Sequence, residues 1–362
     1  MTMKNTHYAN GFSDENLKQS AFVLDEIEQY LTANKFLNPN VSVNYFNNRI
    51  TTAGFVINPT SLVGVTIESL LISKKDAVLT DKPILPPPWI AFPKIERYSI
   101  GWRMGYGESF ITEWGAWLDS LDKKDMKAYQ KLFPEPVTWK GYWKEEDECD
   151  CYEKNEFIIE LWREKGAPKY SLQQIRKDVS EGKQPEYILF WKHGISSDGS
   201  ITKSCFSQWW KSDFWSVDRT YNCMEQFMMA NKAELFEDNE IRQQILQCSD
   251  PKQIKALGRK VKNFDETVWN QIKYSIVLNG NYLKFSQDPG LRDFLLSTGD
   301  SILVEASPYD NIWGIGMEQT DENAFNPLKW KGQNLLGFAL MEVRDEIQRV
   351  WKNADLCEPL ED

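Results

Sequence analysis

The pattern of hydrophobic and polar positions changes near Gln184. Before this residue, helical patterns such as residues 13–36 alternate with short strand-like runs and with a proline-rich run, residues 84–93, that predicts an extended segment. After it, amphipathic helical patterns follow one another with short loops between them. We therefore predict an α+β protein in which a mixed α+β domain, residues 1–184, precedes a mainly α-helical domain, residues 185–355.

Residues 220–236 carry the most informative helical pattern. Their Met and Phe side chains form a broad apolar arc at about 100° per residue, and Glu225 and Lys232 fall inside it. Charged side chains belong on the solvent face of a surface helix, so this placement indicates a local packing role or a lined site. Asn222 can cap the helix, and Glu225 would then close a capping box onto it. A buried acid or base is the alternative that the pattern leaves open.

Composition narrows the possible chemistry. The 53 Asp and Glu outnumber the 42 Lys and Arg, so the net charge of −11 excludes binding of nucleic acid mainly by phosphate neutralisation. A small nucleotide or one modified base in a local pocket is still compatible with this charge. The chain has two histidines, His7 and His193, which disfavours Ser-His-Asp and Cys-His mechanisms. If the protein is an enzyme, carboxylates must supply the acid and base groups. Numerous Trp, Tyr and Phe side chains offer surfaces for stacking a base, although most aromatic residues fill cores.

Several classes of site and location are disfavoured. No apolar run approaches the length that a bilayer requires, and the first residues lack the apolar core of a signal peptide, so we predict a cytoplasmic protein with no membrane partner. The six cysteines show no zinc-type pairing. Only Cys149 and Cys151 lie close together, in an acidic run that favours a solvated loop. We expect no metal and no cofactor.

Two loops near the C-terminus combine glycines with chemically useful side chains. In residues 307–316, Asp310 and Trp313 follow a hydrophobic strand-like run and stand beside two glycines, as is typical of binding loops. Residues 326–332 add a tryptophan and two lysines before a final helix that begins at Asn334. The free N–H groups of that helix start could bind a phosphate. A plain turn and an Asn cap are the alternatives.

Together these segments resemble the NADAR (NAD and ADP-ribose) superfamily of YbiA-like proteins. The resemblance covers about residues 187–352, and the region before residue 184 has no match of this kind. Gln208 stands where many members have Asn. The motifs that carry the resemblance occur in this order: C-F-S-Q-W-W from Cys205, Y-N-C-M-E-Q-F-M-M-A-N-K-A from Tyr221, L-G-R-K-V from Leu257, V-W-N-Q-I-K-Y from Val268, L-V-E-A-S-P-Y-D-N-I-W-G-I-G from Leu303, and N-P-L-K-W-K-G-Q-N-L-L-G-F-A-L-M-E-V-R from Asn326.

The resemblance implies hydrolysis of N-glycosidic bonds to nucleobases or related N-ribosides. Some members resemble hydrolases that remove ADP-ribose from guanine in nucleic acid and so counter toxin ADP-ribosyltransferases, and others hydrolyse early intermediates of riboflavin synthesis. The family pattern implies Glu225 and Asp310 as catalytic residues. It implies Trp269 and Trp313 as substrate-binding residues, with Lys232 and Arg259 as supporting residues. We also predict that the substrate is bound by Phe206, Ser207 and Asn334.

Three functional hypotheses follow. The first is a hydrolase that removes ADP-ribose from guanine, working against a cognate ADP-ribosyltransferase toxin and contacting single-stranded DNA or RNA at a local pocket. The large N-terminal region favours this macromolecular target. The second is an N-glycosidase of ribosylamino-pyrimidine intermediates of riboflavin synthesis. The third is a non-catalytic sensor that binds ADP-ribose or NAD.

Overall fold

The computed structural model describes residues 84–144, 162, 168–194, 196–217 and 219–357, together with three short N-terminal strands. The helix predicted at residues 13–36 and the pair Cys149 and Cys151 lie outside the described residues. The chain is divided into two compact units: residues 1–86, 114–133 and 353–362 form unit 1, and residues 87–113 and 134–352 form unit 2. The mixture of many helices and few strands confirms the α+β class.

Unit 1 contains an antiparallel sheet and a helical part. Strands β1 (Asn44–Phe46), β2 (Arg49–Thr52) and β3 (Phe55–Ile57) pair in sequence order. In the helical part, the Trp114 indole donates to the hydroxyl of Tyr129 at 3.0 Å, and this hydroxyl donates to the backbone carbonyl of Leu85 at 2.8 Å. Tyr129 lies on helix α5 (Lys123–Leu132), so its fully buried side chain connects two segments that are distant in sequence.

The strands of unit 2 form two small sheets. Strands β4 (Tyr187–Phe190) and β7 (Ile302–Glu305) pair in parallel, and Phe190 aligns with Glu305 at their last position. All four residues of β7 are buried, as expected for an apolar run in a parallel pair. Strands β5 (Phe214–Ser216) and β6 (Arg219–Tyr221) form an antiparallel hairpin.

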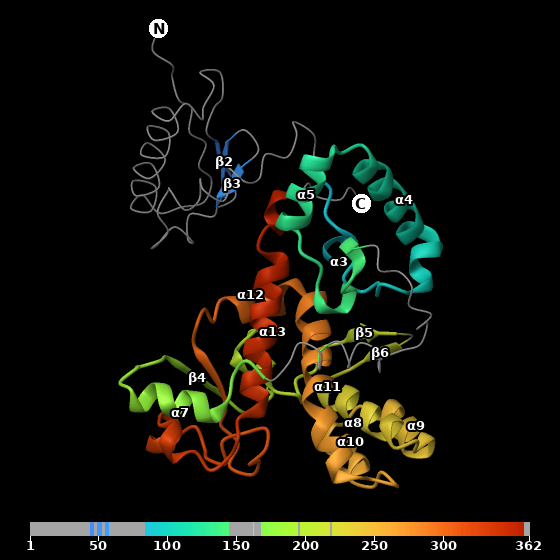
Figure 1. Cartoon of the computed structure of the whole chain (residues 1–362). Helices are drawn as coiled ribbons and strands as arrows, with labels where there is room; N and C mark the ends of the chain where they lie inside the picture. The colour runs from blue at the N-terminus through green and yellow to red at the C-terminus, as the bar shows by residue number, and fades with distance from the viewer. Residues whose placement is uncertain are drawn as a thin grey trace. The chain divides into compact units, whose positions relative to one another are not determined.

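Helices make up most of unit 2 (Figure 1). Aspartate side chains cap several of them: Asp238, Asp250, Asp265 and Asp288 each accept a hydrogen bond from a backbone N–H of the first helical turn. The helices are α4 (Gly105–Asp119, shared between the units), α7 (Leu172–Ser180), α8 (Met224–Leu235), α9 (Asn239–Gln247), α10 (Pro251–Gly258), α11 (Glu266–Gln287), α12 (Pro289–Leu296) and α13 (Leu335–Trp351).

Helix α11 lies at the centre of unit 2, packed against α8, α12 and α13 (Figure 1). Every residue from Ser275 to Gln287 is buried, including the polar residues Asn279, Asn281 and Lys284. The Lys284 ammonium donates to the carbonyl oxygens of Cys205 and Ser207, which offsets part of the cost of its burial. Burial lowers the pKa of Lys284 to about 8. This helix therefore holds the loop that precedes β5.

The prediction of an extended segment over the proline-rich run is wrong for part of the run, although Pro87 is extended. Residues Pro88–Ala91 form a short helix, α3, with Pro88 at its first position. A proline is tolerated there because the first N–H groups of a helix have no partner within it. Trp89 of this helix is buried against Trp139 and Val350. Residues 87–113 thus pack within the same unit as the C-terminal half.

Helix α13 lies directly on the backbone of β7. A Cβ atom added at Gly337 would overlap the carbonyl oxygen of Leu303. The buried side chain of Asn334 lies at the same contact: its amide donates to the Leu303 carbonyl at 2.9 Å, and its oxygen accepts from the N–H of Glu305 at 3.0 Å. Asn334 has φ 56°, a left-handed conformation that asparagine tolerates.

We expect Gly337→Ala to lower the free energy of unfolding by about 3 kcal/mol, because the methyl group must push the helix away from a backbone carbonyl. Gly115→Ala is the matched control within helix α4: nothing lies within 4 Å of the added Cβ. The control should gain about 0.5–1 kcal/mol from helix propensity. Urea unfolding of both variants provides the measurement, and equal stability of the two would contradict the close approach.

In the described parts of the chain, none of the helices combines the length and the apolar character that crossing a bilayer requires.

Candidate functional site

Glu225 lies in the first turn of α8 with its carboxylate buried, 4% exposed. The helix begins at Met224. Its cap position is Cys223, one residue after the predicted cap at Asn222. The capping-box interpretation is wrong, because the N–H of Asn222 donates to the side chain of Gln226 at 2.9 Å, not to that of Glu225. The Glu225 carboxylate is therefore available for another role.

Trp209 orients this carboxylate. Its indole Nε1 donates to Oε2 of Glu225 at 3.1 Å, and the backbone N–H of Glu225 donates to the Gln208 carbonyl at 2.9 Å. Trp209 is in turn held by its own backbone N–H, which donates to the hydroxyl of Ser207 at 3.2 Å. Since Lys284 binds the carbonyls of this same loop, a buried network fixes the loop that carries Trp209.

Lys255 of α10 and Arg259, the residue at the C-cap of this helix, lie close enough for their charges to act on Glu225. Lys255 and Arg259 are four positions apart, which places them one turn apart on one side of the helix end. Burial raises the pKa of Glu225 above its ordinary value, whereas the charge of Lys255, the Trp209 hydrogen bond and the charge of Arg259 act in the opposite direction. The site therefore combines a desolvated carboxylate with nearby cations.

Two further carboxylates come from β7 and the loop after it. Asp310 Oδ1 accepts the backbone N–H groups of Ile312 and Trp313, at 3.0 and 2.8 Å, and its Oδ2 lies 3.9 Å from Nζ of Lys255. Glu305 is the last residue of β7 and is 7% exposed. Burial raises the pKa of Glu305 well above its ordinary value, and the negative charge of Asp310 raises it further. The three carboxylates thus share the positive charge of Lys255.

Lys232 and Trp269 lie beside each other near the C-terminal end of α8. Lys232 is seven residues after Glu225 on α8, so the two side chains leave the same face about 10 Å apart along the axis. Its Nζ lies 4.1 Å from the ring centroid of Phe264 and 5.6 Å from that of Trp269, and it donates to the Gly258 carbonyl at 2.9 Å. Burial lowers the pKa of Lys232. Lys232 therefore packs against aromatic rings, and Trp269 is itself buried.

The contacts of the other predicted residues differ from one to the next. Phe206 is fully buried and packs against core rings, among them Phe190 and Phe285. Asn334 braces β7 through its side chain, and Ser207 holds the turn before Trp209. Trp313 is half-buried beside Asp310.

The start of α13 is not the phosphate site that its position after a lysine-containing loop suggests. The N–H groups of Leu335 and Leu336 donate to the carbonyls of Ile312 and Trp313, at 3.2 and 3.1 Å. The expectation of free donors at this helix start is therefore wrong, because the loop after β7 already occupies them.

Sequence reasoning missed Trp209, Lys255 and Glu305. Two of them had a visible signal, since Trp209 lies in the F-S-Q-W-W run and Glu305 is a carboxylate at the end of an apolar strand. Lys255 had none, because an isolated lysine in an amphipathic helix is typical of a solvated face.

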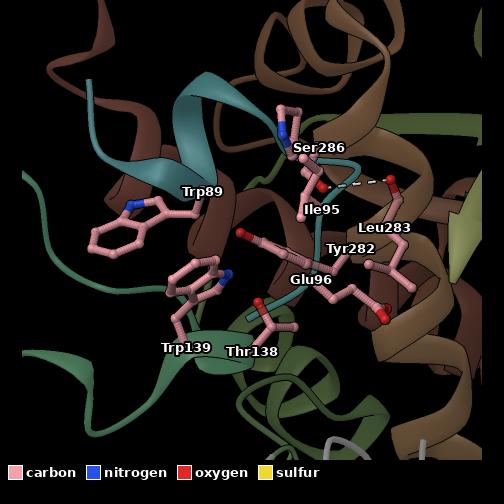
Figure 2. A pocket seen from close by; sticks show the side chains of 9 residues that line it. Trp89, Ile95, Glu96, Thr138, Trp139, Tyr282, Leu283 and Ser286 are labelled. Atoms are coloured by element: carbon pink, nitrogen blue, oxygen red, sulfur yellow. Dashed lines mark hydrogen bonds between the residues drawn. The ribbon is translucent and has the colours of Figure 1, made fainter. Parts of the chain in front are cut away.

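A separate small cavity lies between α11 and the segment around α3 (Figure 2). Trp89, Glu96, Trp139 and Tyr282 are among the residues that line it, and its volume of about 20 Å³ suits one water molecule and no nucleobase. Glu96 also accepts the N–H of Val217 at 2.8 Å, next to the β5–β6 turn. This cavity marks a packing junction of unit 2.

The arrangement around Glu225 suits a reaction that passes through a positively charged carbon. A desolvated carboxylate can stabilise such a centre or activate a water molecule, and the adjacent cations can bind an anionic part of the same substrate. Among the described residues, no three His, Cys, Asp or Glu side chains are grouped so that they could hold a metal ion.

Comparison with known proteins supports the resemblance seen in the motifs. The NADAR domain family matches residues 189–348. The N-glycosidase R617 of Acanthamoeba polyphaga mimivirus is 46% identical over 169 residues, which cover 45% of this chain and 98% of the viral protein.

Two further relatives are more distant. The N-glycosidase YbiA of Escherichia coli is 30% identical over 129 residues, covering 36% of this chain and 72% of YbiA. The NMR structure of the E. coli YbiA protein aligns with 46% of this chain and 86% of its own, at 27% identity and a TM-score of 0.37. The chloroplastic riboflavin biosynthesis protein PYRR of Zea mays is 34% identical over 135 residues, covering 35% of this chain and 20% of the maize protein.

Proposed function

We propose that this chain, which belongs to the NADAR domain family and is an N-glycosidase, removes ADP-ribose from guanine in nucleic acid. The observation that supports this substrate is the position of Lys255, whose Nζ lies 3.9 Å from Oδ2 of Asp310 and 6.0 Å from the ring centroid of Trp209, the residue that donates to Glu225. Arg259 follows four positions later, at the end of the same helix. ADP-ribose has a diphosphate attached to the ribose whose C1′ reacts. Two cations one helical turn apart offer one partner to each phosphate, while the carboxylate faces the sugar.

In the proposed reaction, the C1′–N bond breaks and its electron pair stays on the guanine nitrogen. The sugar becomes an oxocarbenium-like cation, which the Glu225 carboxylate stabilises. Glu225 takes a proton from a water molecule as the water oxygen bonds to C1′. Glu305, whose pKa is raised by burial, supplies the proton that the leaving guanine needs. The products are ADP-ribose and the unmodified base, and the reaction consumes one water molecule.

The remaining site residues bind the substrate in this proposal. Asp310 accepts hydrogen bonds from ribose hydroxyls with the oxygen that faces Lys255. Trp269 and Trp313 limit the slot for the base, as aromatic side chains commonly do in enzymes that act on an exposed base. Such an activity would reverse the product of an ADP-ribosyltransferase toxin, which makes that class of enzyme the expected partner system.

The test uses a DNA oligonucleotide that carries one ADP-ribosylated guanine. Mass spectrometry in H₂¹⁸O should detect ADP-ribose with a single ¹⁸O, together with the unmodified oligonucleotide. Both products are needed, because they show that the C1′–N bond is cleaved and that water is the acceptor. Absence of release from a folded protein would overturn the proposed substrate.

A second candidate substrate is a ribosylamino-pyrimidine intermediate of riboflavin synthesis. The maize relative, named as a riboflavin biosynthesis protein, is the observation that favours it. Turnover of this intermediate without release of ADP-ribose from the oligonucleotide would select it. Tight binding of ADP-ribose with no hydrolysis of either compound would instead identify a sensor.

Trp209→Phe is expected to lower kcat about tenfold, because it removes a hydrogen bond to a charged carboxylate while keeping most of the ring. That bond favours the ionised form, so its loss should raise the pKa of Glu225 and move the acid limb of the pH–rate profile to higher pH. Trp215→Phe is the control, since its ring has no contact with Glu225 that the structure records. A lower kcat with no movement of the acid limb would argue against an orienting role.

A further inference from the structure

The parallel pairing of β4 and β7 brings two loops to one edge of their sheet. Phe190 and Glu305 end the two strands side by side, so residues 191–193 and 306–310 leave the sheet at the same edge. Ligands commonly bind beyond the carboxyl ends of parallel strands, because the loops there are free to carry binding groups. Glu305 and Asp310 already place the reaction site at this edge.

These two loops expose an unusual set of rings. Tyr309 is 87% exposed, and its ring centroid lies 6.2 Å from that of Trp191. The ammonium of Lys192 lies 5.9 Å from the Trp191 ring. His193 follows, and its ring lies 5.4 Å from that of Trp209, the residue that donates to Glu225. Aromatic side chains therefore extend from the buried carboxylate to the solvent.

We propose that Trp191, Lys192 and Tyr309 bind the unpaired nucleotides that flank the modified guanine. The inference rests on the proposed function of the Glu225 site. The exposed ring of Tyr309 and the half-buried ring of Trp191, with the Lys192 cation beside them, form a stacking platform for bases and a partner for one phosphate. These are the features by which proteins bind single strands. A duplex does not suit this surface, because its bases are already stacked on one another.

The charge of the chain limits the size of this surface. A net charge of −11 excludes a long basic surface that follows the phosphate backbone, so only the nucleotides adjacent to the modified base can be bound. Stacking then provides most of the affinity. Because one cation contacts one phosphate, we expect binding to depend only weakly on the salt concentration. DNA and RNA share the unpaired bases that the rings would contact, and both are included in the test.

The experiment compares two substrates: ADP-ribosylated guanosine monophosphate and an ADP-ribosylated single-stranded oligonucleotide, in DNA and RNA forms. Tyr309→Ala should lower the ratio of kcat/KM for the oligonucleotide to kcat/KM for the mononucleotide about tenfold, the effect of losing one stacked base. Tyr309→Phe keeps the ring and should keep the ratio. Tyr106→Ala removes another exposed tyrosine, 67% exposed, and should also leave the ratio unchanged.

A binding measurement separates this inference from the proposed function. Fluorescence anisotropy with unmodified single strands should show weaker binding by Tyr309→Ala than by Tyr309→Phe, and weaker binding of duplex than of single strand by the wild type. These differences are expected even if neither substrate is hydrolysed, a result that would overturn only the proposed function. An unchanged kcat/KM ratio together with unchanged anisotropy for Tyr309→Ala would overturn the inference.

Discussion

Glu225→Gln is expected to lower kcat by about 10³-fold, within the range seen for loss of a positioned acid or base group. The amide keeps the shape of the side chain and can still accept the Trp209 hydrogen bond, so the site should stay folded. It cannot take a proton from water or stabilise a cationic sugar. Single-turnover release of ADP-ribose, followed by mass spectrometry, measures the loss. Glu234→Gln, an exposed position on the same helix, is the control.

The same variant should be more stable than the wild type at neutral pH. The pKa of Glu225 is raised in the folded state, so the stability contributed by its protonated form is complete below the ordinary value of 4.5 and is lost as pH rises through the folded pKa. Glutamine does not ionise and escapes this loss. The melting temperature of Glu225→Gln relative to wild type should therefore increase from pH 4.5 upward. Lower stability across that range would show that the carboxylate is a structural group.

Asp310→Asn should lower kcat/KM about 10²-fold by removing a charged hydrogen-bond acceptor from the ribose site. Asparagine keeps the oxygen that binds the N–H groups of Ile312 and Trp313, so the loop should keep its turn. The negative charge of Asp310 raises the pKa of Glu225 and of Glu305. Its removal should lower both pKa values and move the acid limb of the pH–rate profile to lower pH.

Lys255→Met provides the opposite change. The positive charge of Lys255 lowers the pKa of Glu225, so the acid limb should move to higher pH when this charge is lost. KM for an ADP-ribosylated substrate should also rise, because one phosphate loses its cation. Profiles of kcat/KM against pH for both variants check the two directions. If the acid limb moved in the same direction in both variants, the substitutions would have disturbed the site in general, and the proposed electrostatics would be wrong.

The capping of α8 depends on a contact that is distant in sequence, so the local pattern could not predict it. The sequence contains two side chains, Glu225 and Gln226, that could reach the backbone N–H of Asn222. The structure uses Gln226, whose amide also donates to the carbonyl of Cys248 at 3.0 Å. That second contact comes from the segment after α9, so no local rule could select between the two residues. The choice leaves the Glu225 carboxylate free to accept the hydrogen bond from Trp209.

The sequence by itself determined the features that depend on neighbours along the chain. Helices α9, α10, α11 and α12 begin at aspartate side-chain caps and follow apolar periodicity, because their hydrogen bonds and capping contacts join residues within a few positions. The ordered motifs also identified the family and drew attention to Glu225, Asp310, Trp269 and Trp313.

Tertiary structure alone decided which side chains surround Glu225 and which of the predicted residues are buried. Trp209, Lys255 and Asp310 come from three separate elements, and they meet because α10 packs on α8 and the loop after β7 folds over the same end of the sheet. The same loop occupies the N–H groups at the start of α13 and so removes an anion site that the pattern suggested. Desolvation and charge act through space, so the chemistry of Glu225 depends on contacts that sequence spacing does not contain.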